Sequence, residues 1–415
     1  MAEGLTILVA ARDEAERISA TVEKLRAAFP AAELIVADDG SRDATAALAE
    51  AAGARVLRLP ARGKGQALSL AERAARPGSL LLCDADLEGD PAPLTEVDAD
   101  LAIAAFRKHR GGGFGIAKRA ARALILARCC YAAREPLSGQ RALSRRARAA
   151  CFPVAAGFGC ETRMTIDAVR AGLSVVEVEL PLDHRASGRT LSGFGHRGRQ
   201  LLDTFLACGP LAVNHRGLRL PLAGALVALT PRSGPRGAAL GVPAIAAIGL
   251  LDDLRSGPER GLRAHLRAGR TTGVAKLILI PLVGLATTRS PSGGALVALT
   301  AHVVNLLDTK PGRALKSFMA AALVLGGGTR RAAGLAILLA PYDLREMVML
   351  GDAGSNALGA VLGYESVGKL AGRGRLTVVA ALCGLSILGE YRSLGAVIET
   401  TPGLRALDRF GRQPA

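Results

Sequence analysis

Two sets of acidic residues in this 415-residue chain are suited to binding a divalent cation beside a phosphate. The first set is Asp38-Asp39-Gly40-Ser41 with Asp84-Ala85-Asp86. The second set is Asp252-Asp253, Asn305-Leu306-Leu307-Asp308 and Gly351-Asp352-Ala353-Gly354-Ser355-Asn356, each at the end of an apolar segment. Carboxylate oxygens are preferred ligands of Mg²⁺ and Mn²⁺, and such cations neutralise a diphosphate leaving group. Two sites with this chemistry predict an enzyme that builds a glycan precursor at a membrane.

Short apolar runs alternate with amphipathic stretches over the first 180 residues. The runs predict strands at 5–10, 33–37, 55–59, 79–83 and 100–104. The stretches predict helices at 14–28, 43–52 and 64–75. This alternation predicts a mainly parallel sheet covered on both faces, which is an α/β fold. Ligands bind such sheets at the carboxyl ends of the strands. Because the two acidic motifs of the first set follow the second and fourth strands, we expect them on the same edge.

The pattern changes beyond residue 190. A basic, glycine-containing linker or interfacial segment is predicted at 191–213. Residues 214–412 contain eight apolar segments, near 220–231, 237–251, 273–288, 293–307, 315–327, 332–341, 353–367 and 376–392. Most are shorter than the roughly 20 residues that a spanning helix needs, so the buried helices of a soluble domain are the alternative. If each segment crosses a membrane once, all the second-set acids fall on one face.

We therefore predict an α/β domain over residues 1–190, followed by an all-α multi-pass membrane domain. The expected location is the inner cell membrane, with the first domain on the cytoplasmic side. The seven cysteines include no CxxC pair, which favours a reduced, cytosolic active face. Residues 5–10 lead directly into the α/β pattern, so no signal peptide is expected.

The charge of the chain is uneven. The net charge is +17, of which residues 1–200 carry about +5 and residues 201–415 carry +12. Arginines between apolar segments are typical of cytoplasmic membrane loops and attract anionic lipids. No basic helix with base-reading residues and no aromatic stacking platform is present, so nucleic acid is not an expected partner. Residues 114–133 predict a basic amphipathic helix, which suits either a membrane surface or the solvated face of an ordinary helix.

The first half resembles the family 2 inverting glycosyltransferases of the GT-A fold, particularly those with polyprenyl-phosphate or similar acceptors. The resemblance covers about residues 4–190 and rests on five motifs: Ala10-Ala11-Arg12-Asp13-Glu14, Val36 to Asp43, Gly63 to Leu68, Ser138 to Ala142, and Gly157 to Thr162. It implies a nucleotide-sugar donor and a Mg²⁺ or Mn²⁺ ion. By this resemblance Asp39 and Glu14 would contact the nucleoside, and Asp84 and Asp86 would contact the metal and the diphosphate.

The same resemblance makes Glu161 the carboxylate on the acceptor side. A hydroxyl acceptor needs a general base, whereas a phosphate acceptor is already ionised and needs only orientation. Lys64 would bind the donor, or is a surface lysine. His184, Arg185 and Arg189 would supply a metal ligand and phosphate-binding cations, or are merely exposed to solvent.

The second half, about residues 214–412, resembles the polyprenyl-phosphate N-acetylhexosamine-1-phosphate transferases. That family moves a sugar-1-phosphate from a UDP-sugar to polyprenyl phosphate and releases UMP. By motif, Asp252, Asp253 and Asp308 would be catalytic acids, Asp352 a metal ligand, and Asn305 part of the nucleotide site. Carboxylates at a membrane face are costly unless they bind a cation or one another.

Three hypotheses follow. In the first, a fused membrane enzyme transfers a sugar to polyprenyl phosphate or a related envelope acceptor, and its membrane domain handles the lipid. In the second, only the membrane domain is catalytic, by sugar-1-phosphate transfer, and the first domain delivers the donor. In the third, the chain is a non-catalytic scaffold for envelope assembly. The intact acidic motifs argue against the scaffold, because unused buried carboxylates destabilise a fold.

Overall fold

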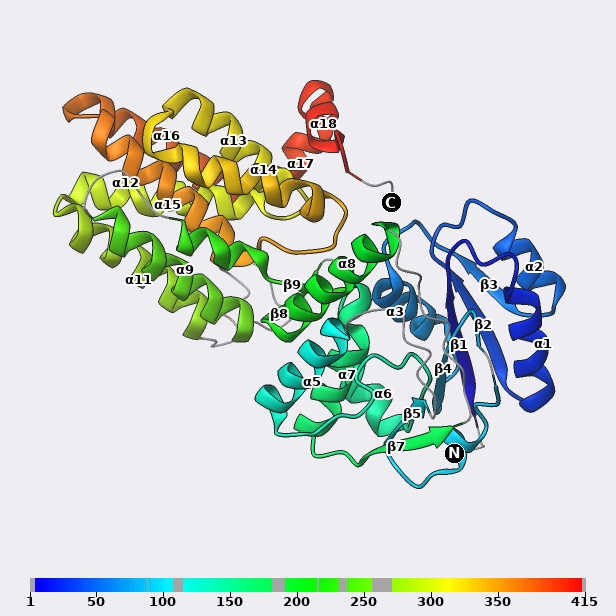
Figure 1. The fold of residues 1–415 in the computed structure, drawn as a ribbon. Coiled ribbons are helices and arrows are strands. Elements are labelled where there is room, and N and C mark those ends of the chain that lie inside the picture. Colours follow the sequence, from blue (N-terminus) through cyan, green and yellow to red (C-terminus); the bar gives the residue numbers. More distant parts are fainter. Residues whose placement is uncertain are drawn as a thin grey trace. The chain divides into compact units, whose positions relative to one another are not determined.

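The computed structural model describes residues 4–87, 89–106, 115–180, 191–214, 216–230, 237–255 and 271–412, and only the backbone of 191–197, 255, 271–274 and 390. The chain forms two compact units, Met1–Pro221 and Leu222–Ala415 (Figure 1). We call them the first unit and the helical unit, and each is described by itself.

The first unit is built on a seven-stranded sheet with strand order β3-β2-β1-β4-β6-β5-β7. Its strands are β1 (Thr6–Ala11), β2 (Glu33–Asp38), β3 (Arg55–Arg58), β4 (Leu80–Asp84), β5 (Leu101–Phe106), β6 (Arg141–Leu143) and β7 (Val175–Leu180). β1 pairs in parallel with β2 and β4, whereas β6 runs antiparallel to both β4 and β5. The five predicted strands are confirmed, and β6 makes the sheet mixed.

Helices cover both faces of this sheet (Figure 1). They are α1 (Ile18–Ala28), α2 (Thr45–Ala51) and α4 (Pro93–Glu96) on one face, and α3 (Lys64–Ala74), α6 (Arg145–Cys151) and α7 (Cys160–Arg170) on the other. α1 shows why they fold: Ile18, Val22 and Leu25 recur at helical spacing and are fully buried. The three predicted helices are confirmed.

The basic helix predicted at 114–133 is α5 (Ile116–Cys129). Its Ile125 is fully buried in a small core together with Ile166 of α7. The ordinary packed helix therefore accounts for part of its apolar face, and a role at a membrane surface stays a prediction.

The predicted linker at 191–213 differs from the structure. It contains the helix α8 (Leu191–Cys208) and the strand β8 (Leu211–Val213), which pairs with β9 (Arg219–Pro221). The side chain of Asp203 in α8 accepts a hydrogen bond from the backbone N–H of Phe158 at 3.0 Å. Tertiary packing thus orders a glycine-containing segment of low helix propensity. The boundary of the first unit lies after β9, not at residue 190.

The second unit is helical. Its elements are η2 (Ala223–Leu229), α9 (Ala238–Arg255), α11 (Thr271–Thr288), α12 (Pro291–Leu307), α13 (Arg313–Leu325), η3 (Gly327–Thr329), α14 (Arg330–Leu344), α15 (Gly351–Lys369), α16 (Gly372–Tyr391), α17 (Leu394–Thr400) and α18 (Pro402–Arg409). The eight predicted apolar segments are helical, although the first of them, η2, is a 3-10 helix.

Helix α15 is almost entirely buried and packs against α9 and α12. Glycines make the approach to α12 close. A Cβ at Gly359 would lie 2.4 Å from the carbonyl oxygen of Thr300, and one at Gly363 would lie 2.6 Å from Cα of Val297. Small residues four positions apart are typical of helix pairs in membranes, where close backbone approach supplies van der Waals packing.

The outer surface of the helical unit is rich in exposed apolar side chains, among them Ile278, Leu282, Leu323, Val324, Ile337, Leu338, Leu376 and Ile387. Among the described residues, only α16 is long and apolar enough to cross a membrane, over Gly372–Gly389. No residue of that window is buried. Two further apolar helices, Ala275–Thr288 and Pro291–Leu307, are shorter. The multi-pass arrangement stays a prediction.

Candidate active sites

A buried carboxylate lies just beyond the carboxyl end of β2. Oδ1 of Asp39 accepts hydrogen bonds from the backbone N–H groups of Arg62, at 2.7 Å, and Gly63, at 3.0 Å; Oδ2 lies 2.9 Å from the latter nitrogen. The guanidinium of Arg12 lies 3.7 Å from Oδ2. Burial raises the pKa of Asp39, and these donors offset only part of the rise. The carboxylate is thus held rigidly where it can accept hydrogen bonds from a ligand.

The loop after β1 is bound to the loop after β2. The backbone N–H of Asp13 donates to Ser41 Oγ at 2.9 Å, and Arg42 N–H donates to Asp13 Oδ1 at 2.7 Å. The backbone N–H of Glu14 donates to Thr45 Oγ1 at 2.8 Å. These bonds hold Glu14 on the same edge of the sheet as Asp39.

Glu14 also interacts with the second acidic motif of this unit. Burial raises the pKa of Glu14, and the negative charge of Asp86 raises it further. Arg17, whose guanidinium lies 3.1 Å from the Glu14 carboxylate, opposes the rise. The structure therefore brings the motif after β4 close to the loop after β1.

Lys64 joins two carboxylates that come from different elements. Its Nζ lies 2.5 Å from Asp84 Oδ1 and 2.7 Å from Glu161 Oε1. Lys64 begins α3, Asp84 ends β4, and Glu161 lies in the first turn of α7. Burial lowers the pKa of Lys64, but the two carboxylates outweigh it and raise the pKa well above its usual value. The side chain is therefore an ammonium ion, and the alternative of a plain surface lysine is wrong.

The segment entering β6 supports this cluster. The carboxylate of Asp84 packs against Gly139, where a Cβ would lie 2.3 Å from Oδ2. The fully buried Arg141 donates to Thr165 Oγ1 at 2.9 Å. Burial lowers the pKa of Arg141, whereas the charge of Glu161 raises it. The sequence placed Arg141 in a motif without giving it a role, because its strand, β6, is too short to predict from the sequence.

Asp84 and Asp86 can supply two of the ligands of a divalent cation, but not a complete protein site. Among the residues that the structure describes, no group of three His, Cys, Asp or Glu side chains could hold a metal ion by itself. Mg²⁺ is commonly bound by one or two carboxylates, with substrate phosphates and water completing an octahedron. The two aspartates fit that mode. His184, Arg185 and Arg189 lie outside the described residues.

A second lysine bridge is present in the helical unit. Nζ of Lys276 in α11 lies 3.0 Å from Asp252 Oδ2 in α9 and also contacts Asp352 Oδ2 in α15. The neighbouring Asp253 accepts hydrogen bonds from the backbone N–H groups of Asp352 and Ala353, both at 2.9 Å. Asp253 therefore satisfies two donors at the N-terminus of α15, which is a capping arrangement.

Other predicted residues of this unit adjoin α15. Ser355 Oγ donates to Asn305 Oδ1 at 2.8 Å, and Asn356 Nδ2 donates to the carbonyl oxygen of Asp352 at 2.7 Å. Asp308 follows α12, and its backbone N–H donates to the carbonyl oxygen of Asn305 at 3.0 Å. The structure thus brings three of the four predicted acids into one cluster.

Lys276 was missed as a site residue. A lysine near the start of an apolar helix was the signal, because a buried ammonium needs a carboxylate partner. Its ammonium group bridges two of the carboxylates that the resemblance assigns to catalysis and to a cation.

Comparison with known proteins bears on the first unit. Residues 6–140 match the profile of the family described as Glycosyl transferase family 2. Glucosyl-3-phosphoglycerate synthase of Mycolicibacterium paratuberculosis is 30% identical over an alignment of 241 positions, which covers 49% of this chain and 72% of that protein.

Solved structures of glucosyl-3-phosphoglycerate synthase from Mycobacterium tuberculosis are also similar. The complex with Mg²⁺ and uridine diphosphate is 27% identical, with a TM-score of 0.42, and the match covers 49% of this chain and 78% of that chain. The complex with Mn²⁺, uridine diphosphate and phosphoglyceric acid is 28% identical, with the same TM-score and the same coverage.

Proposed function

The chain belongs to glycosyl transferase family 2, and from this premise we propose that its first unit transfers a sugar from a uridine diphosphate sugar to a phosphate-bearing acceptor. The cluster of Lys64, Asp84 and Glu161 at the carboxyl edge of the sheet carries the proposal. The proposed donor carries the nucleotide that solved structures of glucosyl-3-phosphoglycerate synthase from Mycobacterium tuberculosis hold with Mg²⁺ or Mn²⁺. Family membership makes the chain a glycosyltransferase, which sets the scaffold hypothesis aside.

The donor would lie across the edge formed by β1, β2 and β4. Asp39 and Glu14 would accept hydrogen bonds from the nucleoside. Asp39 is held at this edge by the backbone N–H of Arg62, and Glu14 by the hydrogen bond that its own backbone N–H donates to Thr45 Oγ1. Asp84 and Asp86 would hold Mg²⁺ or Mn²⁺, which neutralises the diphosphate as it leaves. The ammonium of Lys64 adds a positive charge beside the same diphosphate.

The pairing of Glu161 favours an acceptor that is already ionised. Its Oε1 lies 2.7 Å from the Lys64 ammonium, and its Oε2 accepts a hydrogen bond from Cys160 Sγ at 3.1 Å. General-base catalysis by Glu161 would require its carboxylate to leave this ion pair. A phosphate oxygen needs no base, so Glu161 would orient the acceptor and would not remove a proton.

We propose that the phosphate belongs to a polyprenyl lipid and that the helical unit is embedded in a membrane. Three features of the described residues support this. No residue of the apolar window Gly372–Gly389 in α16 is buried. Apolar side chains are exposed on α11, α13 and α14, and glycines bring α12 and α15 into close contact. Charged residues in membrane proteins face the interior and pair with one another, as Lys276 does with Asp252.

Product analysis tests the reaction. Purified protein in detergent with Mn²⁺ and UDP-[¹⁴C]glucose is offered undecaprenyl phosphate in one arm and 3-phosphoglycerate in the other. We expect UDP and a labelled lipid in the first arm, and ¹H NMR of the product would test the predicted inversion at the anomeric carbon. Product only with phosphoglycerate contradicts the lipid acceptor but keeps the glycosyltransferase. No UDP with either acceptor, across a panel of UDP-sugars, contradicts the proposed reaction.

A second candidate activity belongs to the helical unit. Asp252, Asp352 and Lys276 come from three helices, and their convergence favours the predicted sugar-1-phosphate transfer. The two aspartates would hold Mg²⁺, and Lys276 would turn toward the phosphate. The diagnostic product is UMP. Its absence with UDP-N-acetylhexosamines and undecaprenyl phosphate, in protein that still releases UDP, contradicts this second activity and leaves the first standing.

A further inference from the structure

Helix α18 near the end of the chain, together with the residue that follows it, exposes apolar side chains. Leu404, Leu407 and Phe410, three residues apart, are 45%, 69% and 78% exposed. Asp408 is the one residue of α18 that is buried. Leaving such side chains in water forgoes roughly 25 cal/mol of stabilisation for each Å² of apolar surface that could be buried.

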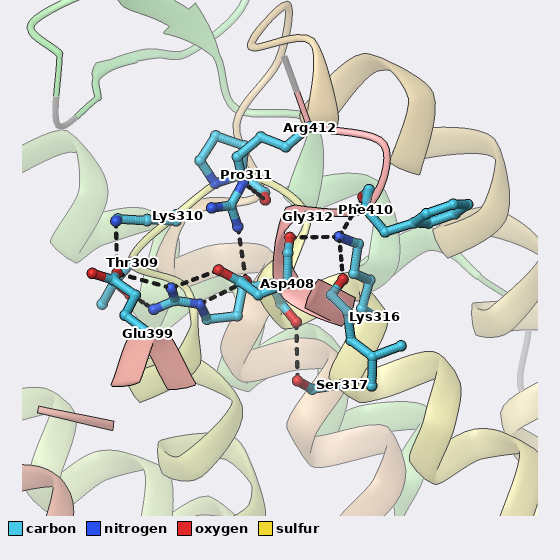
Figure 2. Close-up of polar contacts among 12 residues, drawn as sticks. Thr309, Lys310, Pro311, Gly312, Lys316, Ser317, Glu399, Asp408, Phe410 and Arg412 are labelled. Carbon is cyan, nitrogen blue, oxygen red and sulfur yellow. Dashed lines mark hydrogen bonds and ion pairs between the residues drawn. The ribbon is translucent and has the colours of Figure 1, made fainter. Parts of the chain in front are cut away.

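Ionic contacts fix the orientation of α18 (Figure 2). The guanidinium of Arg313, only 3% exposed, donates to both carboxylate oxygens of Asp408, at 3.0 and 2.9 Å. Arg412 donates to the same carboxylate at 2.8 Å. Burial alone would raise the pKa of Asp408, but the two arginines outweigh it and lower the pKa to about 2. The contacts therefore persist throughout the physiological pH range.

Lys316 completes the attachment by capping the end of the helix. Its Nζ donates to the carbonyl oxygens of Leu407, Asp408 and Phe410, at 3.0, 2.8 and 2.6 Å. The ring of Phe410 points away from this ionic cluster (Figure 2). Because one face of α18 is held by Arg313 and Lys316, the apolar side chains are presented outward in a fixed direction.

The exposed surface also carries positive charge. Arg405 and Arg409 lie four residues apart on α18, and both are exposed. At 3.6 residues per turn they fall on the face opposite Leu404, Leu407 and Phe410. A helix with apolar side chains on one face and arginines on the other is the pattern of a helix that lies in the headgroup region of an anionic bilayer.

If α16 spans a bilayer, its length places α17 and α18 at the membrane–water interface. α16 has 20 residues, which at a rise of about 1.5 Å each span the roughly 30 Å hydrocarbon core of a bilayer. It ends at Tyr391, which is 74% exposed and followed by Arg392, both typical of a membrane–water interface. α17 follows two residues later and leads directly into α18.

We propose that α18 is an interfacial helix that inserts Leu404, Leu407 and Phe410 into the surface of an anionic bilayer while Arg405 and Arg409 contact lipid phosphates. This inference rests on the membrane embedding of the helical unit proposed above. It adds the element that binds the headgroups and the Arg313–Asp408 pair that positions it.

Fluorescence gives a direct test, because the chain contains no tryptophan. Leu407→Trp and Phe410→Trp are reconstituted, as full-length protein, into phosphatidylcholine vesicles with and without phosphatidylglycerol. The control is Glu23→Trp on an exposed position of α1. We expect a blue-shifted emission, quenched by lipids with brominated acyl chains, for both α18 variants and not for the control. Unquenched, water-like emission from α18 contradicts the proposal.

Two further measurements test the role of the arginines and whether a second copy of the chain, not lipid, covers the apolar side chains. Arg405→Gln with Arg409→Gln, in the Leu407→Trp background, should reduce quenching several-fold in vesicles that contain phosphatidylglycerol and change it little in neutral ones. An equal loss of quenching in anionic and in neutral vesicles overturns the role of the arginines. A blue shift that grows with protein concentration in detergent, without lipid, would mean that a second copy covers the apolar side chains. UDP release by the same samples reports separately on the glycosyltransferase.

Discussion

The two units contain lysine bridges of the same kind in opposite surroundings. Lys64 joins Asp84 and Glu161 at the edge of a sheet, and Lys276 joins Asp252 and Asp352 between helices. Each bridge places one ammonium between two carboxylates from elements that are distant in the sequence. A lysine between two carboxylates therefore does not by itself identify a fold or a reaction.

The surfaces around the bridges differ. Over the described parts of the chain, six large apolar side chains are exposed in the first unit and twenty-three in the helical unit. A polar exterior fits a site that binds a water-soluble nucleotide sugar. An apolar exterior around buried charges is the arrangement expected in lipid, where charges gather inside. The surroundings, more than the charged residues, distinguish the two sites.

The largest expected effect separates the two sites by their products. Asp84→Asn should lower UDP release by about 10³-fold, roughly 4 kcal/mol of transition-state stabilisation, because a metal ligand is lost. Asp252→Asn, matched in chemistry, should leave UDP release unchanged and abolish any UMP release. Radiometric assay of both nucleotides checks this. If Asp252→Asn lowers UDP release as much as Asp84→Asn, the two sites are not independent.

The lysines themselves come next. Lys276→Met leaves Asp252 and Asp352 without their shared cation, and breaking a buried pair typically costs about 3 kcal/mol. We expect a lower unfolding temperature for the helical unit alone, measured by calorimetry in detergent. Lys64→Met is the matched control and should lower only the transition of the first unit. A shift of both transitions in either variant contradicts the separation into two units.

A packing change sharpens the comparison of the two surfaces. Gly363→Leu should destabilise the helical unit by about 2 kcal/mol, because its side chain would press on the backbone of α12 near Val297. Gly384→Leu on α16 is the control, since no atom lies within 4 Å of a Cβ there. Thermal unfolding in detergent measures both. Equal losses of stability in the two variants would mean that α16 is packed at Gly384, where the structure leaves open space.

The smallest expected effect concerns Asp39. Its pKa is raised in the folded state, so its ionised form disfavours folding, and that cost appears only as the pH rises above the ordinary value near 3.8. Asp39→Asn should therefore raise the unfolding temperature of the first unit by about 2 °C at pH 7 and leave it unchanged near pH 3. Binding of uridine diphosphate should weaken at the same time. A variant that binds as well as the parent removes Asp39 from the nucleotide site.

The sequence predicted the elements with strong periodicity and missed those that packing decides. The first five strands and the apolar helices follow from runs of buried residues. β6 is only three residues long, and a run of that length carries no period. α8 contains Gly193, Gly195 and Gly198, which lower helix propensity, so its order depends on contacts such as that of Asp203 with Phe158.

The sequence alone determined the two-part organisation, the strand–helix alternation of the first part and the acidic motifs with their divalent-cation chemistry. These depend on local pattern and on residue type. The pairing of the lysines was decided only by the tertiary structure. Lys276 is 24 positions from Asp252 and 76 from Asp352, and no local rule joins them. Helix packing sets those distances, because the close contacts between α9, α12 and α15 depend on glycines and small side chains that carry no chemical signal of their own.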